Sequence, residues 1–130
     1  MALILVVDDE PDIRALLRLI LERSGHQVVD AADGVLALGL CQSQCPDLVF
    51  CDIFMPGMEG LETMKKLRAL HPETKIVAMS GGARTVPMDF LAVAEVMAAD
   101  LILPKPLAKE KVLEAIERLL PARSAYAGSA

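Results

Sequence analysis

The chain has 130 residues, of which 54% are hydrophobic and 24% charged, so it has the length of one domain and enough apolar residues for a core. Its formal net charge of -5 argues against nucleic acid as a direct partner. The longest uncharged apolar stretch, 34–41, is too short for a membrane span, and the apolar run 1–7 lacks the basic start of a signal peptide. These features exclude a disordered chain and a membrane anchor, and we expect a soluble cytoplasmic domain.

Five short apolar runs have the composition of strands that are buried on both faces of a parallel sheet. The first, Leu3-Ile-Leu-Val-Val7, is the clearest because it is continuous and rich in β-branched residues. The expected strands span residues 3–7, 28–29, 48–51, 76–79 and 101–103.

A helix is expected after each strand, because apolar residues recur there at helical spacing. The helices run from Pro11 to Gly25, from Asp33 to about Gln44, through Leu61 and Leu67, from Met88 to about Ala98, and through Val112 and Leu119. Parallel strands require helical crossovers, so the alternation predicts an α/β three-layer sandwich around a five-stranded parallel sheet. We expect one domain over residues 1–121, and a flexible tail or linker stub over the small, polar residues 122–130.

Polar residues stand where the expected strands end, and ligands bind at the carboxyl ends of strands in such sheets. Asp8 and Asp9 follow the first strand, Asp52 the third, Ser80 the fourth and Lys105 the fifth. Three crowded carboxylates repel one another unless a cation is present. The ligands are oxygens without an evident bidentate cage, so Mg²⁺ is favoured over Ca²⁺. With the ammonium and the hydroxyl, such a site suits phosphoryl transfer to a carboxylate.

These residues resemble the receiver domain of two-component response regulators. The resemblance extends from residue 3 to about residue 120 and rests on four motifs in a fixed order. The motifs are Val7-Asp8-Asp9-Glu10, Pro46-Asp47 leading to Asp52-Ile-Phe-Met-Pro-Gly-Met-Glu-Gly60, Met79-Ser80-Gly81 and Leu103-Pro104-Lys105-Pro106. The resemblance implies a flavodoxin-like fold with strand order 2-1-3-4-5, which agrees with the alternation of strands and helices.

The resemblance also implies a role for each acidic residue. Asp52 would be the phosphoacceptor, taking a phosphoryl group from a sensor histidine kinase or a phosphotransfer protein. Asp9, Asp52 and the backbone carbonyl of Phe54 would bind Mg²⁺, and Asp8 would act through a bound water. The chain would be a signalling switch and not an enzyme, since it would catalyse only its own phosphorylation and dephosphorylation.

Ser80 and Lys105 would contact the phosphoryl oxygens, and Pro106 would follow a cis peptide bond, as is typical of the family. One position departs from the pattern of many receivers, which carry an aromatic residue three positions before the lysine. Ile102 stands there in this chain, and its aliphatic side chain cannot move a ring in or out of solvent as an aromatic gate does.

The run from Val86 to Pro104 contains few charges, although apolar residues occupy nearly every side of its expected helix. One explanation is deeper burial of this helix. The other is that the fourth helix and fifth strand form a surface for a downstream protein or for self-association, as receivers commonly use this face.

Three other functions are alternatives to the switch. A phosphohydrolase with an aspartyl intermediate would need a D-x-D motif after the first strand and a cap domain. A flavin mononucleotide binder would need a phosphate loop where Asp8-Asp9-Glu10 would repel phosphate. A degenerate receiver that acts as a scaffold would not need the complete acidic set.

The cysteines and histidines are given no functional role by the sequence. Cys41 and Cys45 have no partners at zinc spacing, so the cysteines are interpreted as buried or idle thiols. His26 and His71 lie in loops away from the acidic motifs, which argues against a catalytic or phosphorelay role for either.

Overall fold

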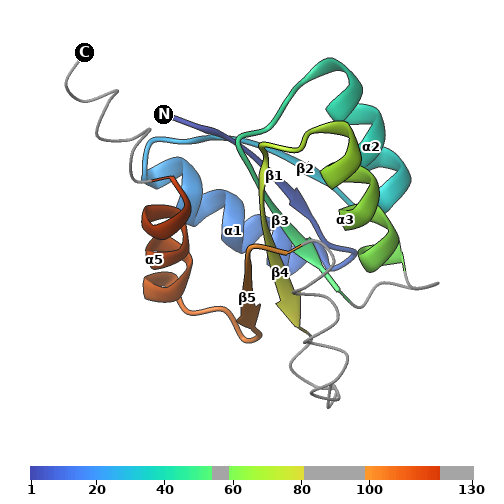
Figure 1. Ribbon diagram of the computed structural model, residues 1–130. Helices are drawn as coiled ribbons and strands as arrows, with labels where there is room; N and C mark the ends of the chain where they lie inside the picture. Colours follow the sequence, from blue (N-terminus) through green and yellow to red (C-terminus); the bar gives the residue numbers. More distant parts are fainter. Residues whose placement is uncertain (54–58, 81–98, 121–130) are drawn as a thin grey trace.

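The computed structural model describes residues 1–53, 59–80 and 99–120, and strands and helices alternate in it as far as residue 80 (Figure 1). The strands are β1 (Leu3–Val7), β2 (Gln27–Ala31), β3 (Leu48–Asp52), β4 (Lys75–Ser80) and β5 (Leu101–Pro104). The helices are α1 (Pro11–Arg23), α2 (Gly34–Ser43), α3 (Glu59–Leu70) and α5 (Lys109–Leu119). The helix expected at 88–98 and the tail expected at 122–130 lie outside the described residues.

All strand pairs are parallel, and the order in the sheet is β2-β1-β3-β4-β5. This confirms the predicted flavodoxin-like topology. The three inner strands β1, β3 and β4 are almost wholly buried. The edge strand β2 is exposed at Gln27, half-buried at Val29 and Asp30, and buried at Val28 and Ala31. Burial on both faces explains why the inner strands appear in the sequence as continuous apolar runs.

Helices cover both faces of the sheet, with α1 and α5 on one side and α2 and α3 on the other (Figure 1). Successive residues of a strand point to opposite faces. Ile4 and Val6 of β1 therefore join the core under α1 and α5, while Leu5 and Val7 join the core under α2 and α3. The same alternation places Cys51 and its neighbour Asp52 on opposite faces of β3.

Local signals fix the helix ends that the sequence predicted. Pro11 opens α1, where its missing N–H costs no hydrogen bond, and Gly25 follows the helix with a positive φ of 92°. Asp33 caps α2, because its side chain accepts a hydrogen bond of 2.9 Å from the backbone N–H of Leu36.

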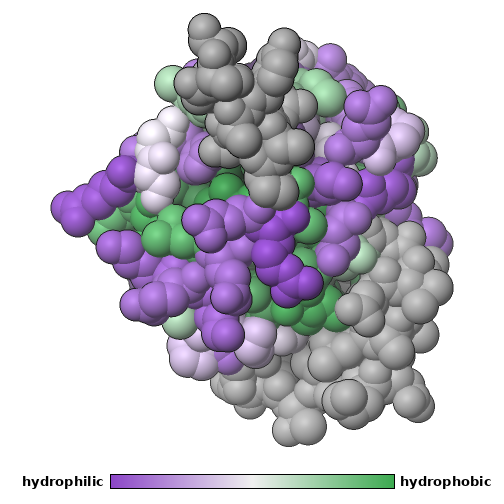
Figure 2. Space-filling view, turned by 60° about the vertical axis from the view of Figure 1, so that its left-hand side comes forward, coloured by the Kyte–Doolittle hydropathy of each residue, from purple (hydrophilic) through white to green (hydrophobic). Residues whose placement is uncertain are grey.

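The surface over α1 and α5 is mostly hydrophilic, with hydrophobic residues visible between charged ones (Figure 2). Leu16 and Leu19 of α1 are among the exposed hydrophobic residues. Among the residues that the structure describes, none of the helices is both long enough and apolar enough to span a membrane.

Helix α3 begins directly against the end of β3, and this approach requires a glycine. A Cβ atom on Gly60 would overlap the backbone carbonyl oxygens of Asp52 and Ile53. Backbone atoms cannot move aside as the tip of a side chain can, so a larger residue would push α3 away from the strand that carries Asp52.

Gly60→Ala should therefore lower the free energy of unfolding by about 1–3 kcal/mol through overpacking. The matched control is Gly39→Ala in the middle of α2, where a new Cβ would have no neighbour within 4 Å. That control should raise the free energy of unfolding by about 0.5–1 kcal/mol, because alanine favours the helix. Urea unfolding of both variants measures these changes. Equal stability of Gly60→Ala and the parent would contradict the close approach of α3 to the end of β3.

Candidate functional site

The carboxyl ends of β1 and β3 bring three carboxylates together at one edge of the sheet. Val7 is the register partner of Cys51, so the next residues, Asp8 and Asp52, are neighbours on adjacent strands. Asp8, Asp9 and Asp52 each offer a carboxylate oxygen, and these three oxygens lie within 4.8 Å of one another. Asp8 is 0% exposed and Asp52 is 3% exposed, whereas Asp9 is open to solvent. We call these three residues the acidic cluster.

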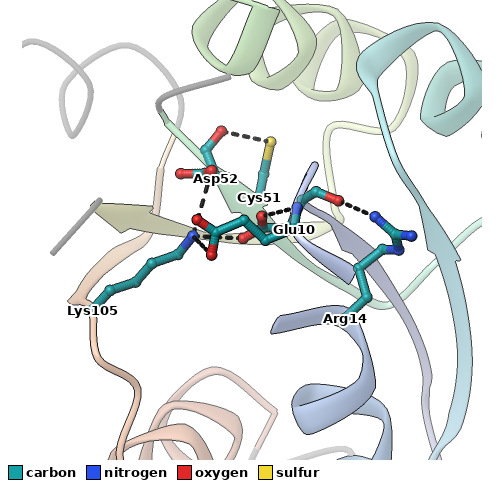
Figure 3. Close-up of polar contacts among 6 residues, drawn as sticks. Glu10, Arg14, Cys51, Asp52 and Lys105 are labelled. Atoms are coloured by element: carbon teal, nitrogen blue, oxygen red, sulfur yellow. Dashed lines mark hydrogen bonds and ion pairs between the residues drawn. The ribbon is translucent and has the colours of Figure 1, made fainter. Parts of the chain in front are cut away.

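Lys105 reaches the acidic cluster from the residues that follow β5 (Figure 3). Its Nζ lies 2.7 Å from Asp8 Oδ2 and 3.4 Å from Asp52 Oδ2, and its side chain is only 8% exposed. The backbone N–H of Lys105 donates a 2.9 Å hydrogen bond to the carbonyl of Ser80, and its peptide bond to Pro106 is cis, as expected. The ammonium is therefore placed between the two buried carboxylates.

Every polar group of Asp8 has a partner, because its backbone N–H donates a hydrogen bond of 3.1 Å to the carbonyl of Ala31 and its oxygens all accept hydrogen bonds. Its Oδ1 accepts a hydrogen bond of 2.9 Å from the backbone N–H of Glu10, and its Oδ2 accepts one of 2.7 Å from Lys105. Its carbonyl oxygen accepts a bond of 2.7 Å from Nη1 of Arg14, one turn into α1. These contacts fix the position of Asp8 beside Asp52.

The pKa values of Asp8 and Lys105 reflect both burial and pairing. Burial raises the pKa of Asp8 above its usual value, although the hydrogen bonds from Lys105 and from the Glu10 backbone act in the opposite direction. For Lys105, burial lowers the pKa, but the hydrogen bond to Asp8 and the charges of Asp52, Asp8 and Glu10 outweigh it, and the net pKa is raised. Lys105 is thus a firmly protonated cation among carboxylates.

The acidic cluster has the donor chemistry of a site for a hard divalent cation. Its ligands are carboxylate oxygens only, which suits Mg²⁺ better than softer metals. Three carboxylates against the single ammonium of Lys105 leave an excess of negative charge, and two positive charges would balance it. Asp9, being exposed, leaves that side of the cluster open to water and to a substrate.

Ser80 ends β4 on the other side of β3. Asp52 pairs with Met79 in the register, so Ser80 lies one residue further toward the carboxyl edge, where it pairs with Pro104 of β5. Its side chain is buried, as the residue is 8% exposed. The fourth expected ligand, the carbonyl of Phe54, lies outside the described residues.

Two residues near the site were given no role by the sequence. Glu10 places its Oε1 4.0 Å from Nζ of Lys105, and Arg14 holds the Asp8 carbonyl. The hydrogen bond from the Glu10 N–H to Asp8 could have been predicted from the sequence, because an aspartate side chain often accepts a hydrogen bond from the backbone N–H two residues later. The Arg14 contact had none, since it depends on the angle at which α1 leaves the sheet.

Cys51 takes no part in the acidic cluster. It belongs to the core under α2 and α3, on the opposite face of β3 from Asp52, as the strand alternation predicted. Burial raises the pKa of its thiol, with a further contribution from the charges of Asp52 and Asp8. A buried thiol of raised pKa is chemically inert, which confirms its interpretation as a packing residue.

Comparison with known proteins agrees with this architecture. Residues 4–117 match the family described as the response regulator receiver domain. Sporulation initiation phosphotransferase F of Bacillus subtilis is 30% identical over 121 residues, which are 93% of this chain and 95% of that protein. The response regulator MprA of Mycobacterium sp. (strain KMS) is 38% identical over 117 residues, which are 90% of this chain and 50% of that protein. The chain therefore spans nearly all of the first relative and half of the second.

A solved structure shows the same arrangement of strands and helices. The receiver domain of NtrX from Brucella abortus has a TM-score of 0.83 and 34% sequence identity, covering 91% of this chain and 98% of that one. The family match extends over most of the chain and includes the strand ends that carry the acidic cluster and Lys105. The chain therefore belongs to the response regulator receiver domains of two-component systems, signalling proteins for which phosphorylation is characteristic.

Proposed function

We propose that this chain is a phosphorylation-controlled switch whose phosphoacceptor is Asp52. The observation that supports this most directly is the buried Asp52 carboxylate, 3.4 Å from Nζ of Lys105 and within the acidic cluster. A sensor histidine kinase or a phosphotransfer protein would be the donor. The chain would be a signalling protein that catalyses only the gain and loss of its own phosphoryl group.

The transfer is an in-line displacement at phosphorus. A carboxylate oxygen of Asp52 forms the new O–P bond while the P–N bond of the donor phosphohistidine breaks, and the imidazole leaves with the bonding electron pair. Lys105 then pairs with a phosphoryl oxygen in place of part of its interaction with Asp8 and Asp52. The Ser80 hydroxyl donates to another phosphoryl oxygen from the neighbouring strand. Negative charge on the product is thus met by groups already held at the sheet edge.

Asp9 and Asp52 would bind Mg²⁺ directly and Asp8 through a water, with the Phe54 carbonyl as a further expected ligand outside the described residues. When bound, the cation supplies the positive charge that lets the carboxylate and the phosphoryl oxygens approach each other. Arg14 and the Glu10 N–H keep Asp8 in place during this approach, because both hydrogen-bond to it without being ligands.

The output surface would be the fourth helix together with β5, acting on a downstream protein or a second copy of the chain. β5 is the edge strand next to β4, and its residues Leu101 and Ile102 are only partly buried. The fourth helix lies outside the described residues. The receiver would comprise residues 1–121, with 122–130 as a flexible tail or linker stub, in a cytoplasmic protein without direct nucleic-acid contact.

Asp52→Asn should abolish phosphorylation by a small acyl-phosphate donor in the presence of Mg²⁺, because the amide keeps the shape of the side chain but is not a nucleophile. Asp12→Asn, on the exposed first turn of α1, is the control and should be phosphorylated like the parent. Intact-protein mass spectrometry measures the added phosphoryl group and its lability to base. Full phosphorylation of Asp52→Asn would place the acceptor elsewhere, and an unphosphorylated parent would favour the degenerate scaffold.

Lys105→Met should lower the free energy of unfolding by about 3 kcal/mol in metal-free buffer, since it leaves two buried carboxylates without their cation. Added Mg²⁺ should restore much of this loss, because binding to the folded state stabilises it. Lys111→Met, which removes only an exposed pair with Glu114, should change stability by less than about 0.5 kcal/mol. Urea unfolding with and without Mg²⁺ measures the stability of the parent and of both variants. An equal loss of stability in the two variants would contradict the pairing of Lys105 with the buried carboxylates.

The ion pair between Lys105 and Asp8 also predicts how the stability of the protein depends on pH in alkaline solution. The raised pKa of Lys105 means that the folded state holds this proton more tightly than the unfolded chain does. Its stabilising contribution is complete below the usual lysine pKa and is lost as the pH rises through the raised value. The stability difference between the parent and Lys105→Met should therefore be constant from neutral pH to about pH 10 and then shrink. A difference that grows above that pH would contradict the assigned direction.

A further inference from the structure

A thiol and an imidazole face each other at the amino end of the sheet, the end opposite the acidic cluster. Cys45 lies between α2 and β3, and His71 lies between α3 and β4. Cys45 Sγ is 3.2 Å from His71 Nδ1, and His71 Nε2 is 2.8 Å from the carbonyl oxygen of Cys41. The Cys45 side chain is exposed, so small molecules can reach it.

The contact with the Cys41 carbonyl fixes the tautomer of the His71 imidazole. A carbonyl oxygen only accepts hydrogen bonds, so Nε2 of His71 must carry the hydrogen. A neutral imidazole has one N–H, which leaves the lone pair of Nδ1 pointing at the thiol of Cys45. The three groups thus form a nucleophile, a base and a group that orients the base, the arrangement that activates nucleophiles in enzymes.

The backbone on both sides of this pair is held in place. Thr74 donates its hydroxyl to the carbonyl of Pro46 at 2.7 Å and its backbone N–H to the carbonyl of His71 at 3.1 Å. Nη1 of Arg68 donates to the carbonyls of Pro72 and Thr74 at 3.0 and 2.7 Å. Within the described part of the chain, the thiol of Cys45 has one other acceptor, the carbonyl of Pro46 at 4.0 Å, so the imidazole of His71 at 3.2 Å is the nearer partner.

The other two cysteines do not share this setting. Cys41 is 2% exposed, and burial together with the neighbouring Cys45 raises the pKa of its thiol to about 11. Cys51 is fully buried in the core. A thiol must be accessible to solvent before it can react, and Cys45 is the one exposed thiol among the three cysteines.

We propose that Cys45 is a covalent modification site that undergoes thiol–disulfide exchange with small disulfide compounds, with His71 as its base. The thiol proton moves from Sγ to Nδ1 of His71, and the thiolate attacks one sulfur of the disulfide. A new mixed S–S bond forms as the original S–S bond breaks, and its electron pair leaves on the second sulfur, which takes the proton from His71. Cys45 is oxidised and the departing half of the disulfide is reduced.

This site gives the receiver a second covalent input, separate from Asp52 by the length of β3. The sequence is interpreted as holding buried or idle thiols; the structure shows Cys45 exposed and in contact with His71, a contact that no spacing rule predicts. Cys45 lies in the connection that leads into β3, and in the same connection Asp47 is bound to β1. The backbone N–H of Asp47 donates to the carbonyl of Leu3, and its carboxylate accepts from the N–H of Leu3, each at 2.8 Å.

The test is the rate at which an aromatic disulfide, whose released thiolate absorbs visible light, reacts with the native full chain. One thiol should react in a fast phase, and Cys45→Ser should remove that phase. His71→Gln keeps a donor for the Cys41 carbonyl but has no base, so it should slow the fast phase at least about tenfold near neutral pH. At about pH 10, where thiols ionise unaided, the variant and the parent should differ by less than about twofold.

His26→Gln is the matched control, because His26 accepts a hydrogen bond from the backbone of Ala2 and contacts no cysteine in the described part of the chain. It should leave the fast phase unchanged. A fast phase that survives in Cys45→Ser, or the same rates for His71→Gln and the parent at neutral pH, would overturn the proposal. A second measurement needs no variant: the folded parent's fast thiol should react faster at neutral pH than the thiols of the urea-unfolded chain, and an equal or slower rate would overturn the proposal.

Discussion

The ion pair between Asp8 and Lys105 is the interaction on which the site depends. Two nearly buried carboxylates and one exposed carboxylate share a single buried ammonium, so the site carries an excess of negative charge. Burial alone would favour neutral side chains, yet the folded chain keeps Lys105 protonated 2.7 Å from Asp8. The pair also joins the end of β1 to the residues after β5, so β1, β3, β4 and β5 must be assembled before the charges are compensated.

Much of the fold follows from one constraint, the burial of the inner strands on both faces. Such strands must be apolar along their length, so their first polar residue marks the carboxyl edge where ligands bind. Val7 is followed by Asp8, and Cys51 by Asp52, which is why both the strands and the position of the site could be predicted. The prediction was weaker for β2, expected at 28–29 and observed at Gln27–Ala31. As an edge strand it is only partly buried and can contain polar residues such as Gln27 and Asp30. An apolar run therefore does not mark where this strand begins and ends.

What the sequence did not predict depends on how side chains from different elements meet. The bond from Arg14 to the Asp8 carbonyl and the contact between Cys45 and His71 join residues whose separation along the chain carries no signal. The requirement for glycine at position 60 is similar, because it comes from the distance between α3 and β3. Periodicity and turn chemistry describe one element at a time. Contacts of this kind therefore become visible only when the elements are packed against each other.

The link between β4 and β5 bears on how a phosphoryl group would be sensed without an aromatic residue at position 102. Ile102 is partly buried against the core under α2 and α3, so its side chain is held by packing. Ser80 and Lys105, the two proposed phosphate contacts beside Asp52, are joined by the hydrogen bond from the Lys105 N–H to the Ser80 carbonyl. Movement of either group toward the phosphoryl oxygens therefore acts on the same backbone junction. In this receiver the ends of β4 and β5 are thus joined, by their strand pairing and by this hydrogen bond, at the place where the phosphoryl group is expected.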